Sequence, residues 1–592
     1  MSVAGPDKPA RDGWARSVAL TWLKALGVLG LICAVYIVTR HGYSISDVFL
    51  LRQDLPVAFS CAALIAVVAL SSLRLPAPAL AFLDRLVERQ GLAIVLAAAL
   101  LVAGGAFAGW WLVYQTYPLS LDEFWAAFDA RIFGSGRFLA PVAAQWRAYV
   151  PALEPMWRLE IPGAQAWAST YLPVNAAFRG LFGLIGSQAL SGPFWAAMSI
   201  LLVYVLARQF WPARRDAAFV AGILLATSSQ LIVTAMSPYA MSAHLALNLA
   251  WLWLFLRKGP LAMCAALVVA FAATGLHQFI FHPLFAGPFI LQLWFQRRWR
   301  PAVIYTLAYA AIGLFWVSWW PVLFALQGLP AGAAHAAAAG ASAEALAMAF
   351  NPIGVNLMAE NLLRLVLWQN PLTVPLAMIG ALVAWRDRNP VMLPMAAGII
   401  LTVLFLVVIT PFQGHGWGYR YLHGYLGSLC LLAALAWISL TGAADETGRA
   451  RGWACLAVTS LAAVGLWLPI RLKEAHEFIQ PYARSWAAIE HAHADVVIVD
   501  ASGLWYANDL VRNDPFLEQG PKIMHRYLLS DTQLKALCAR YRVAYFDRRD
   551  GVRYGITPVL GETSFAGQKA LSPLAGRGRL QPPDCARPVT AP

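Results

Sequence analysis

Long apolar segments recur along most of this chain, and they limit what it can fold into. Segments of about 20 apolar residues cross the ~30 Å hydrocarbon core of a bilayer as single helices. Of the 592 residues, 60% are hydrophobic and 12% are charged, whereas soluble domains carry about 25% charged residues. The sequence therefore predicts an all-α polytopic membrane protein with about thirteen transmembrane helices. The predicted spans are 18–39, 57–73, 91–113, 188–207, 217–235, 242–256, 260–279, 283–296, 302–326, 371–385, 391–410, 425–440 and 453–470.

The positions of the basic residues indicate how these spans are oriented. The net charge is +14, but Arg and Lys occur in small groups between apolar segments rather than in one patch, so no nucleic-acid partner is predicted. The groups fall on alternate loops, which is the pattern of cytoplasmic loops. We therefore expect the N-terminus inside, and the loops 114–187, 327–370 and 411–424 and the tail from residue 471 outside. All eleven His residues fall on this outer side, either because that side is functional or because interfaces tolerate His.

Three regions are expected along the chain. Residues 1–90 form an N-terminal cytoplasmic segment with two extra transmembrane helices, residues 91–470 form the main membrane domain, and residues 471–592 form a small extracytoplasmic α/β domain. In that tail, "HADVVIVDASG" and "YRVAYFD" are typical of buried strands, and "SDTQLKALCARY" is typical of a helix capped by Ser530. Cys538 and Cys585 lie in this tail, and the sequence does not decide whether they pair.

A group of acids follows the third apolar segment, in "PLSLDEFWAAFDARIFGSGRF" (residues 118–138). Ser120 and Glu123 have the spacing of a capping box, so a helix should begin at Leu121 and end near the "GSG" of residues 134–136. Asp122 suits the positive end of that helix, but Asp129 lies two turns further on, where a cap has no use for it. The two Asp residues share one helix face and would need a polar cavity or a partner.

Several short motifs resemble those of the GT-C glycosyltransferases, integral membrane enzymes that include bacterial aminoarabinose and mannose transferases and protein O-mannosyltransferases. The resemblance covers roughly residues 91–440, and the final Pro of the family's "R-Y-x-x-P" motif is missing here, with Tyr425 near its place. The matching residues are Asp122 and Glu123 in the first loop, Ala130, Arg131 and Gly136 in the following segment, Tyr171 and Pro173 before the next span, and Arg420 and Tyr421 in the late turn.

This resemblance implies a transfer of sugar from a polyprenyl-phosphate donor to a lipid, glycan or protein acceptor of the cell envelope, in a bacterial inner membrane. Asp122 would be the general base, with Glu123 as its neighbour or as an acceptor-binding acid. Arg420 is the first candidate to hold the donor phosphate, although an interfacial Arg among aromatic residues would look the same. Further binding candidates are Arg147, Arg158, Tyr421 and Asp129.

The segment "GLHQFIFHP" carries His277 and His282. Their spacing of five does not stack them on one helix face, so hydrogen bonding to sugar or phosphate by His277, His282 and His415 is favoured over a metal site. A divalent metal remains possible, and no other cofactor is implied. The main rival function is a transporter or lipid flippase, which would more often show paired halves and polar residues at the membrane midplane. No internal repeat is visible here, and the polar residues cluster at the outer ends of the spans.

Overall fold

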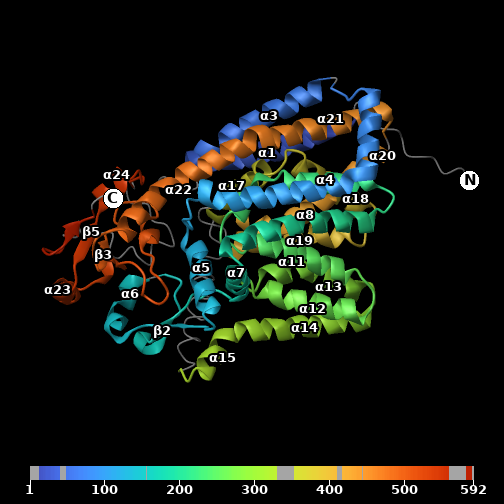
Figure 1. The fold of residues 1–592 in the computed structure, drawn as a ribbon. Helices are drawn as coiled ribbons and strands as arrows, with labels where there is room; N and C mark the ends of the chain where they lie inside the picture. The colour runs from blue at the N-terminus through green and yellow to red at the C-terminus, as the bar shows by residue number, and fades with distance from the viewer. Residues whose placement is uncertain are drawn as a thin grey trace, which may run out of the picture.

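The chain folds into a bundle of apolar helices with a small α/β unit at one end, as seen in a computed structural model (Figure 1). The structure describes residues 13–39, 49–71, 73–154, 156–329, 353–409, 416–442, 444–558 and 582–589. Eight described helices are long and apolar enough to cross a membrane, and a ninth crossing results if one bent pair counts as a single span. The prediction of a helical polytopic membrane protein is confirmed.

Eight of the thirteen predicted spans lie within or overlap these long helices. The helices generally extend beyond the apolar segments that predicted them. They are α1 (Gly13–Thr39), η1 with α3 (Leu50–Asp54, Leu55–Leu70), α4 (Ala77–Leu112), η4 with α8 (Gln188–Leu190, Ser191–Phe210), α14 (Trp299–Val317), α19 (Met392–Ile409), η5 with α20 (Arg420–Tyr425, Leu426–Gly442), and α21, η6 and α22 in sequence (Glu446–Ala462, Ala463–Trp467, Leu468–Glu490).

The other five predicted spans are helical but differ from a straight crossing. One is the pair α9 (Arg215–Ala226) and α10 (Ser229–Ala235), bent by 53°. At the bend the Ser228 side chain accepts a hydrogen bond from the Leu231 amide at 3.1 Å and so starts a new helix. The remaining four have only 14 or 15 residues, fewer than the ~20 that a straight crossing requires. They are α11 (Met241–Phe255), α12 (Pro260–Thr274), α13 (Phe281–Phe295) and α18 (Thr373–Arg386).

The long loop 114–187 is folded, and its predicted helix is present as α5 (Leu121–Gly134). Both halves of the capping box form: the Glu123 amide donates to the Ser120 hydroxyl at 3.2 Å, and the Ser120 amide donates to the Glu123 carboxylate at 2.7 Å. The other elements of this loop are β1 (Ala140–Pro141), η2 (Ala144–Tyr149), α6 (Val150–Leu153), η3 (Pro162–Ala164), β2 (Ala166–Trp167) and α7 (Val174–Leu184). Beyond it, α15 (Trp319–Leu326) is the end of the predicted span 302–326, which breaks at Ser318, and α17 (Ile353–Leu367) is a helix that the sequence pattern did not single out.

The C-terminal unit (residues 495–558 and 582–589) contains a parallel sheet of strand order β4-β3-β5-β6. Both predicted strands and the predicted helix are present, and Ser530 caps the helix with Gln533 in a second capping box. A disulfide joins Cys538 to Cys585, which is typical of an oxidising compartment. The elements are β3 (Val496–Val499), η7 (Ala507–Leu510), β4 (Lys522–His525), η8 (Arg526–Leu528), α23 (Asp531–Arg540), β5 (Val543–Phe546), α24 (Arg548–Arg553) and β6 (Arg587–Pro588).

The sheet of the C-terminal unit is buried on both faces, as parallel sheets usually are. Alternate residues of β3 point to opposite faces. Val497 and Val499 belong to the apolar cluster that contains Ile489 of α22, whereas Val496 and Ile498 belong to the cluster that contains Trp167 of the long loop. The long loop and the C-terminal unit therefore share one core, and they lie side by side at one end of the bundle (Figure 1).

A buried group of charges ties the N-terminal helices to the rest of the bundle. The Asp54 carboxylate, at the end of η1, pairs with Arg364 of α17 and with Arg471 of α22, each at 3.2 Å. The Trp368 indole also donates to this carboxylate, at 3.1 Å. The side chain of Asp54 is fully buried, so the two guanidinium groups replace the water that it would otherwise need.

We expect Asp54→Asn to destabilise the protein strongly, because it removes the paired carboxylate from the buried Arg364 and leaves the buried Arg471 with Glu474, at 2.9 Å, as its one remaining carboxylate among the described residues. Removing one partner of a buried ion pair costs about 3–5 kcal/mol. Thermal unfolding in detergent is the measurement. The matched control is Asp84→Asn, which breaks the pair with Arg449, where the side chains are 36% and 43% exposed. Exposed pairs contribute about 0–1 kcal/mol. Equal losses in the two variants would contradict the assigned role of Asp54.

Candidate active site

Asp122, at the start of α5, pairs with Arg420, which lies 298 residues further along the chain in η5. The Arg420 Nη1 atom is 2.6 Å from the Asp122 Oδ2 atom. The other carboxylate oxygen accepts a hydrogen bond from the Tyr171 hydroxyl. The two side chains of the ion pair are only 17% and 10% exposed. The structure therefore brings together the predicted base and the first phosphate candidate.

His277 completes this group from the segment between α12 and α13. Its ring stacks on Tyr171 with 4.2 Å between the ring centroids. Two backbone bonds hold this segment beside the long loop: the Leu172 amide donates to the His277 carbonyl at 3.2 Å, and the Val174 amide donates to the Gly275 carbonyl at 3.0 Å. Burial lowers the pKa of His277 to about 4, although Asp122 opposes this. The imidazole is therefore neutral at pH 7, with one donor and one acceptor.

The ion pair decides the charge of Asp122. Burial by itself raises the pKa of a carboxyl, but the Arg420 guanidinium and the Tyr171 hydroxyl lower it, so that the pKa of Asp122 is about 2. The carboxylate is therefore ionised and already hydrogen-bonded at neutral pH. As long as Arg420 pairs with it, Asp122 is a weak base.

The turn that carries Arg420 is fixed from two sides. Gln230 of α10 donates to the Tyr419 carbonyl at 2.8 Å, and it lies so close to Gly418 that an added Cβ there would come within 2.4 Å of it. Arg364, the partner of Asp54, donates to the Gly416 carbonyl at 2.7 Å. The guanidinium of Arg420 also faces the rings of Tyr239 and Tyr421, at 5.1 and 5.3 Å.

A small cavity adjoins this group. Its volume is about 20 Å³, room for one or two water molecules. A sugar donor would therefore have to displace side chains in order to enter. The lining includes His244, Asn248, His277, Arg420 and Tyr421. Both ring nitrogens of His244 are buried and have no hydrogen-bond partner among the described residues, so they are available to a ligand.

Glu123, the residue after Asp122, caps the N-terminus of α5. Its carboxylate accepts from the Ser120 amide, and the Ser120 hydroxyl lies 2.9 Å from the Tyr239 hydroxyl. Burial raises the pKa of Glu123 to about 7, against the opposing hydrogen bond from Ser120. Its position is explained by capping, and its contact with Arg420 is only indirect, through Ser120 and Tyr239.

The Asp129 side chain contacts Ser169, in a later segment of the long loop, and does not face an open cavity in the described part of the chain. Its carboxylate accepts from the Ser169 amide at 3.2 Å and from the Ser169 hydroxyl at 2.5 Å. The side chain thereby ties α5 to the segment that carries Tyr171. Burial raises the pKa of Asp129 to about 7, while the two bonds from Ser169 lower it less. The partner that the sequence required for this acid is therefore Ser169.

The other predicted binding residues lie apart from the ion pair. Arg147 donates to the Val142 carbonyl at 3.1 Å, and Arg158 donates to the Glu154 carbonyl at 3.1 Å and pairs with Glu160 at 2.8 Å. Among the described residues, neither Arg forms a hydrogen bond or an ion pair with Asp122.

Of the two remaining His candidates, His282 lies among the described residues. His282 lies between Asn248 and Tyr309, with a ring nitrogen 2.8 Å from each. These two contacts occupy both nitrogens and link α13 to α11 and α14. His415 lies outside the described residues.

Arg512 of the C-terminal unit reaches the start of α5 and was not predicted as a site residue. It donates to the Pro118 carbonyl and, at 2.8 Å, to the Leu119 carbonyl, and it covers the Tyr117 ring at 4.0 Å. Nearby, burial raises the pKa of Asp509 to about 7, with Arg512 opposing it. No local sequence signal marks either residue, because their role depends on where the tail docks.

Within the described residues, no group of three or more His, Cys, Asp and Glu side chains is placed to hold a metal ion. The site is instead made of one ion pair, phenol groups and neutral imidazoles. Such a set can bind an anion at Arg420, accept a proton at Asp122 and form hydrogen bonds with hydroxyl groups.

Comparison with solved structures gives distant likenesses. No protein-family model matches the chain, and no curated protein matches its sequence significantly. Among solved structures, the crystal structure of ArnT from Cupriavidus metallidurans in the apo state aligns with 72% of this chain and 85% of that chain. The identity is 12% and the TM-score is 0.45. At this level the likeness assigns no residue.

We expect the stability of the protein to fall between about pH 4 and about pH 7, in part because of Asp129. An acid whose pKa is raised on folding stabilises the folded protein when it is protonated. This contribution is complete below the pKa of the unfolded chain, about 4, and it is lost as the pH rises through the pKa of the folded protein. For Asp129 that value is about 7. Thermal unfolding of Asp129→Asn should therefore depend less on pH than that of the wild type. Asp531→Asn, at an exposed position on α23, should keep the wild-type slope, and equal slopes in all three proteins would refute the assignment.

Proposed function

We propose that this protein is a GT-C-like glycosyltransferase that moves a sugar from a polyprenyl-phosphate donor to an acceptor on the extracytoplasmic face of the membrane. The observation that carries the proposal is the contact between Asp122 and Arg420, at 2.6 Å. A base for the acceptor hydroxyl and a cation for the leaving phosphate are the two groups that this reaction needs, and the contact of a carboxylate with a guanidinium supports assigning these roles to Asp122 and Arg420.

In the proposed reaction the acceptor oxygen attacks the anomeric carbon of the donor sugar. The bond from that carbon to the phosphate oxygen breaks, its electron pair stays with the phosphate, and the acceptor proton passes to Asp122. A single displacement inverts the anomeric carbon. The transition state carries positive charge on the sugar and growing negative charge on the phosphate, so a carboxylate and a guanidinium stabilise opposite ends of it.

The resting ion pair gives the two residues a linked function. When the donor phosphate binds, it competes with Asp122 for the Arg420 guanidinium. Loss of that partner raises the pKa of the buried Asp122 carboxyl toward the range in which a carboxylate accepts a proton effectively. Donor binding would thus convert a weak base into a competent one. Tyr171 still donates to the carboxylate and keeps its orientation.

The surrounding side chains suit sugar hydroxyl groups. His277 is neutral and offers one donor and one acceptor beside Asp122. The Trp157 ring, which is 49% exposed, stacks against Tyr171 at 6.2 Å between centroids and presents an aromatic surface at the edge of the site. These groups support a sugar substrate, whereas a transport pathway would need polar groups deeper in the bundle.

We further propose that the site faces the outer side of a bacterial inner membrane, with the N-terminus in the cytoplasm. The alternation of basic loops supports this orientation. The disulfide between Cys538 and Cys585 agrees with it, since the C-terminal unit shares a core with the loop that carries Asp122. The partners would be the donor lipid, the surrounding membrane lipids and an acceptor on that face.

The proposal is tested with purified protein in nanodiscs and a panel of radiolabelled polyprenyl-phosphate sugars. Sugar release or transfer by the wild type should fall by about 10²–10⁴ in Asp122→Asn, because the base is lost while the shape is kept. Asp531→Asn is the matched control and should keep full activity. Retained turnover in Asp122→Asn would refute the role of the base, and ligand-dependent transport without turnover would favour a transporter.

Arg420→Gln should separate the two functions of the guanidinium. We expect kcat/KM for the donor to fall by about 10²–10³, the cost of removing one group that stabilises transition-state charge. The acid limb of its pH profile should also move to higher pH, because Asp122 no longer has the partner that lowers its pKa to about 2. A reduced rate with an unchanged acid limb would show that Arg420 does not control Asp122.

A further inference from the structure

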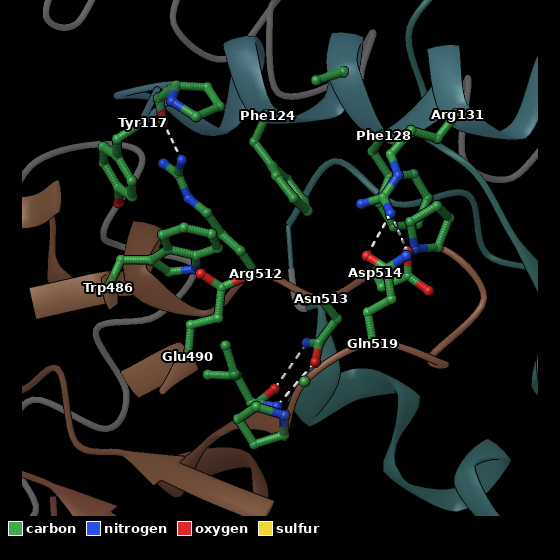
Figure 2. Close-up of a pocket in the computed structure, with 16 residues that line it drawn as sticks. Tyr117, Phe124, Phe128, Arg131, Trp486, Glu490, Arg512, Asn513, Asp514 and Gln519 are labelled. Carbon is green, nitrogen blue, oxygen red and sulfur yellow. Dashed lines mark hydrogen bonds and ion pairs between the residues drawn. The ribbon is translucent and has the colours of Figure 1, made fainter. Parts of the chain in front are cut away.

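We infer that a second cavity, on the opposite side of α5 from Asp122, binds one sugar ring of the acceptor. The cavity has a volume of about 180 Å³ and lies between α5, α22 and the loop 512–521 of the C-terminal unit (Figure 2). This is below the ~300–1,000 Å³ of sites for drug-sized ligands and suits a single ring. The assignment of this ring to the acceptor rests on the proposed function. The inference that the cavity binds a sugar does not depend on it.

The cavity is separate from the candidate active site. Phe124, Phe128 and Arg131 line it, and their spacing of three and four places them on one face of α5. Asp122 and Asp129 occupy the opposite face by the same geometry. Figure 2 shows Phe124 and Phe128 pointing from α5 toward the loop of the C-terminal unit, with Trp486 and Glu490 of α22 beside them.

Aromatic rings form much of the wall. Phe124 and Phe128 come from α5, Trp486 comes from α22, and Tyr117 lies just before α5. Phe124 and Trp486 are half-buried, so part of each ring faces the cavity. The carbon–hydrogen faces of sugar rings are apolar and pack on aromatic rings, while their hydroxyl groups need polar partners at the edge.

Two polar groups of the wall are available to a ligand. The indole nitrogen of Trp486 is buried and has no hydrogen-bond partner among the described residues. Glu490 follows four residues later on the same face of α22, and in the described part of the chain its carboxylate accepts no hydrogen bond. An indole N–H and a carboxylate are one donor and one acceptor, which complement the hydroxyl groups of a sugar.

The charges of the wall exclude a phosphate ligand. Arg131 pairs with Asp514 at 2.8 Å and also donates to Gln519 at 2.9 Å. Arg512 donates to the carbonyls of Pro118, Leu119 and Asp509. Both cations are thus already engaged, and the Glu490 carboxylate would repel an anion. The ligand is therefore a neutral or amino sugar, which distinguishes this cavity from the donor site at Arg420.

The position of the cavity sets a minimum size for the acceptor. A helix with its side chains is about 10–12 Å across, and α5 separates the cavity from Asp122. An acceptor that occupies both sites must therefore extend around α5 with more than one ring. The geometry points to an acceptor that already carries a short glycan, held by one of its rings while another accepts the new sugar.

The test is saturation-transfer NMR on the full protein in nanodiscs, titrated with glucose, mannose, galactose, glucosamine and a hexose phosphate. We expect binding of at least one neutral or amino sugar and weaker binding of the hexose phosphate. Glu490→Gln keeps the shape of the wall, and Trp486→Phe removes the indole N–H while keeping an aromatic ring. Each should weaken binding by at least about tenfold, the effect of losing one hydrogen bond to a charged or buried group. Glu518→Gln, at an exposed position on the same loop, is the matched control and should bind as the wild type.

Asp122→Asn separates this inference from the proposed function, because it should abolish transfer and leave sugar binding unchanged. Loss of binding in Asp122→Asn would place the sugar at the transfer site and overturn the inference. No binding of any sugar, unchanged binding in both cavity variants, or a preference for the hexose phosphate would also overturn it. Thermal unfolding of each variant confirms that the comparison is made between folded proteins.

Discussion

The contact between Asp122 and Arg420 organises one end of this molecule, because each residue is held by structure that the other does not touch. Asp122 is fixed by the capping box at the start of α5 and by Arg512, which binds the two carbonyls just before it. Arg420 is fixed by a turn that Gln230 and Arg364 hold from opposite sides. A buried ion pair is stabilising only when both partners are held in good geometry. The loop, the bundle and the C-terminal unit all contribute to that geometry.

Three acids of one helix show how strongly the surroundings determine charge. Asp122 stays ionised because a guanidinium faces it, and its pKa is about 2. Glu123 and Asp129 are also buried but accept hydrogen bonds from neutral groups only, and both have a pKa of about 7. The helix therefore carries one permanent anion among groups that are half-protonated near neutral pH. Of the three, only the ionised residue faces Arg420, which agrees with its proposed role in the reaction.

Local patterns in the sequence predicted local structure well. The helix that begins at Leu121, its capping box and the strands of the tail depend on neighbouring residues, and all are present. Apolar runs predicted helices at all thirteen positions but overestimated how many are long enough to cross, since hydropathy does not reveal bends or short helices. The contacts of Asp54 and Arg512 could not be predicted, because each joins segments hundreds of residues apart. The sequence named Asp122 and Arg420 as separate candidates, through the resemblance to known enzymes, and did not predict that they pair.

The core shared by the long loop and the C-terminal unit has a consequence for how the chain matures. The loop 114–187 is synthesised well before the tail, since a ribosome adds about 5–20 residues per second. Until the tail follows, Trp167 and the other apolar residues of the loop have no sheet to pack against. Arg512 likewise cannot reach the carbonyls that precede Asp122. The contacts that hold Asp122 in place are therefore completed last, after the final hundred or so residues have been made.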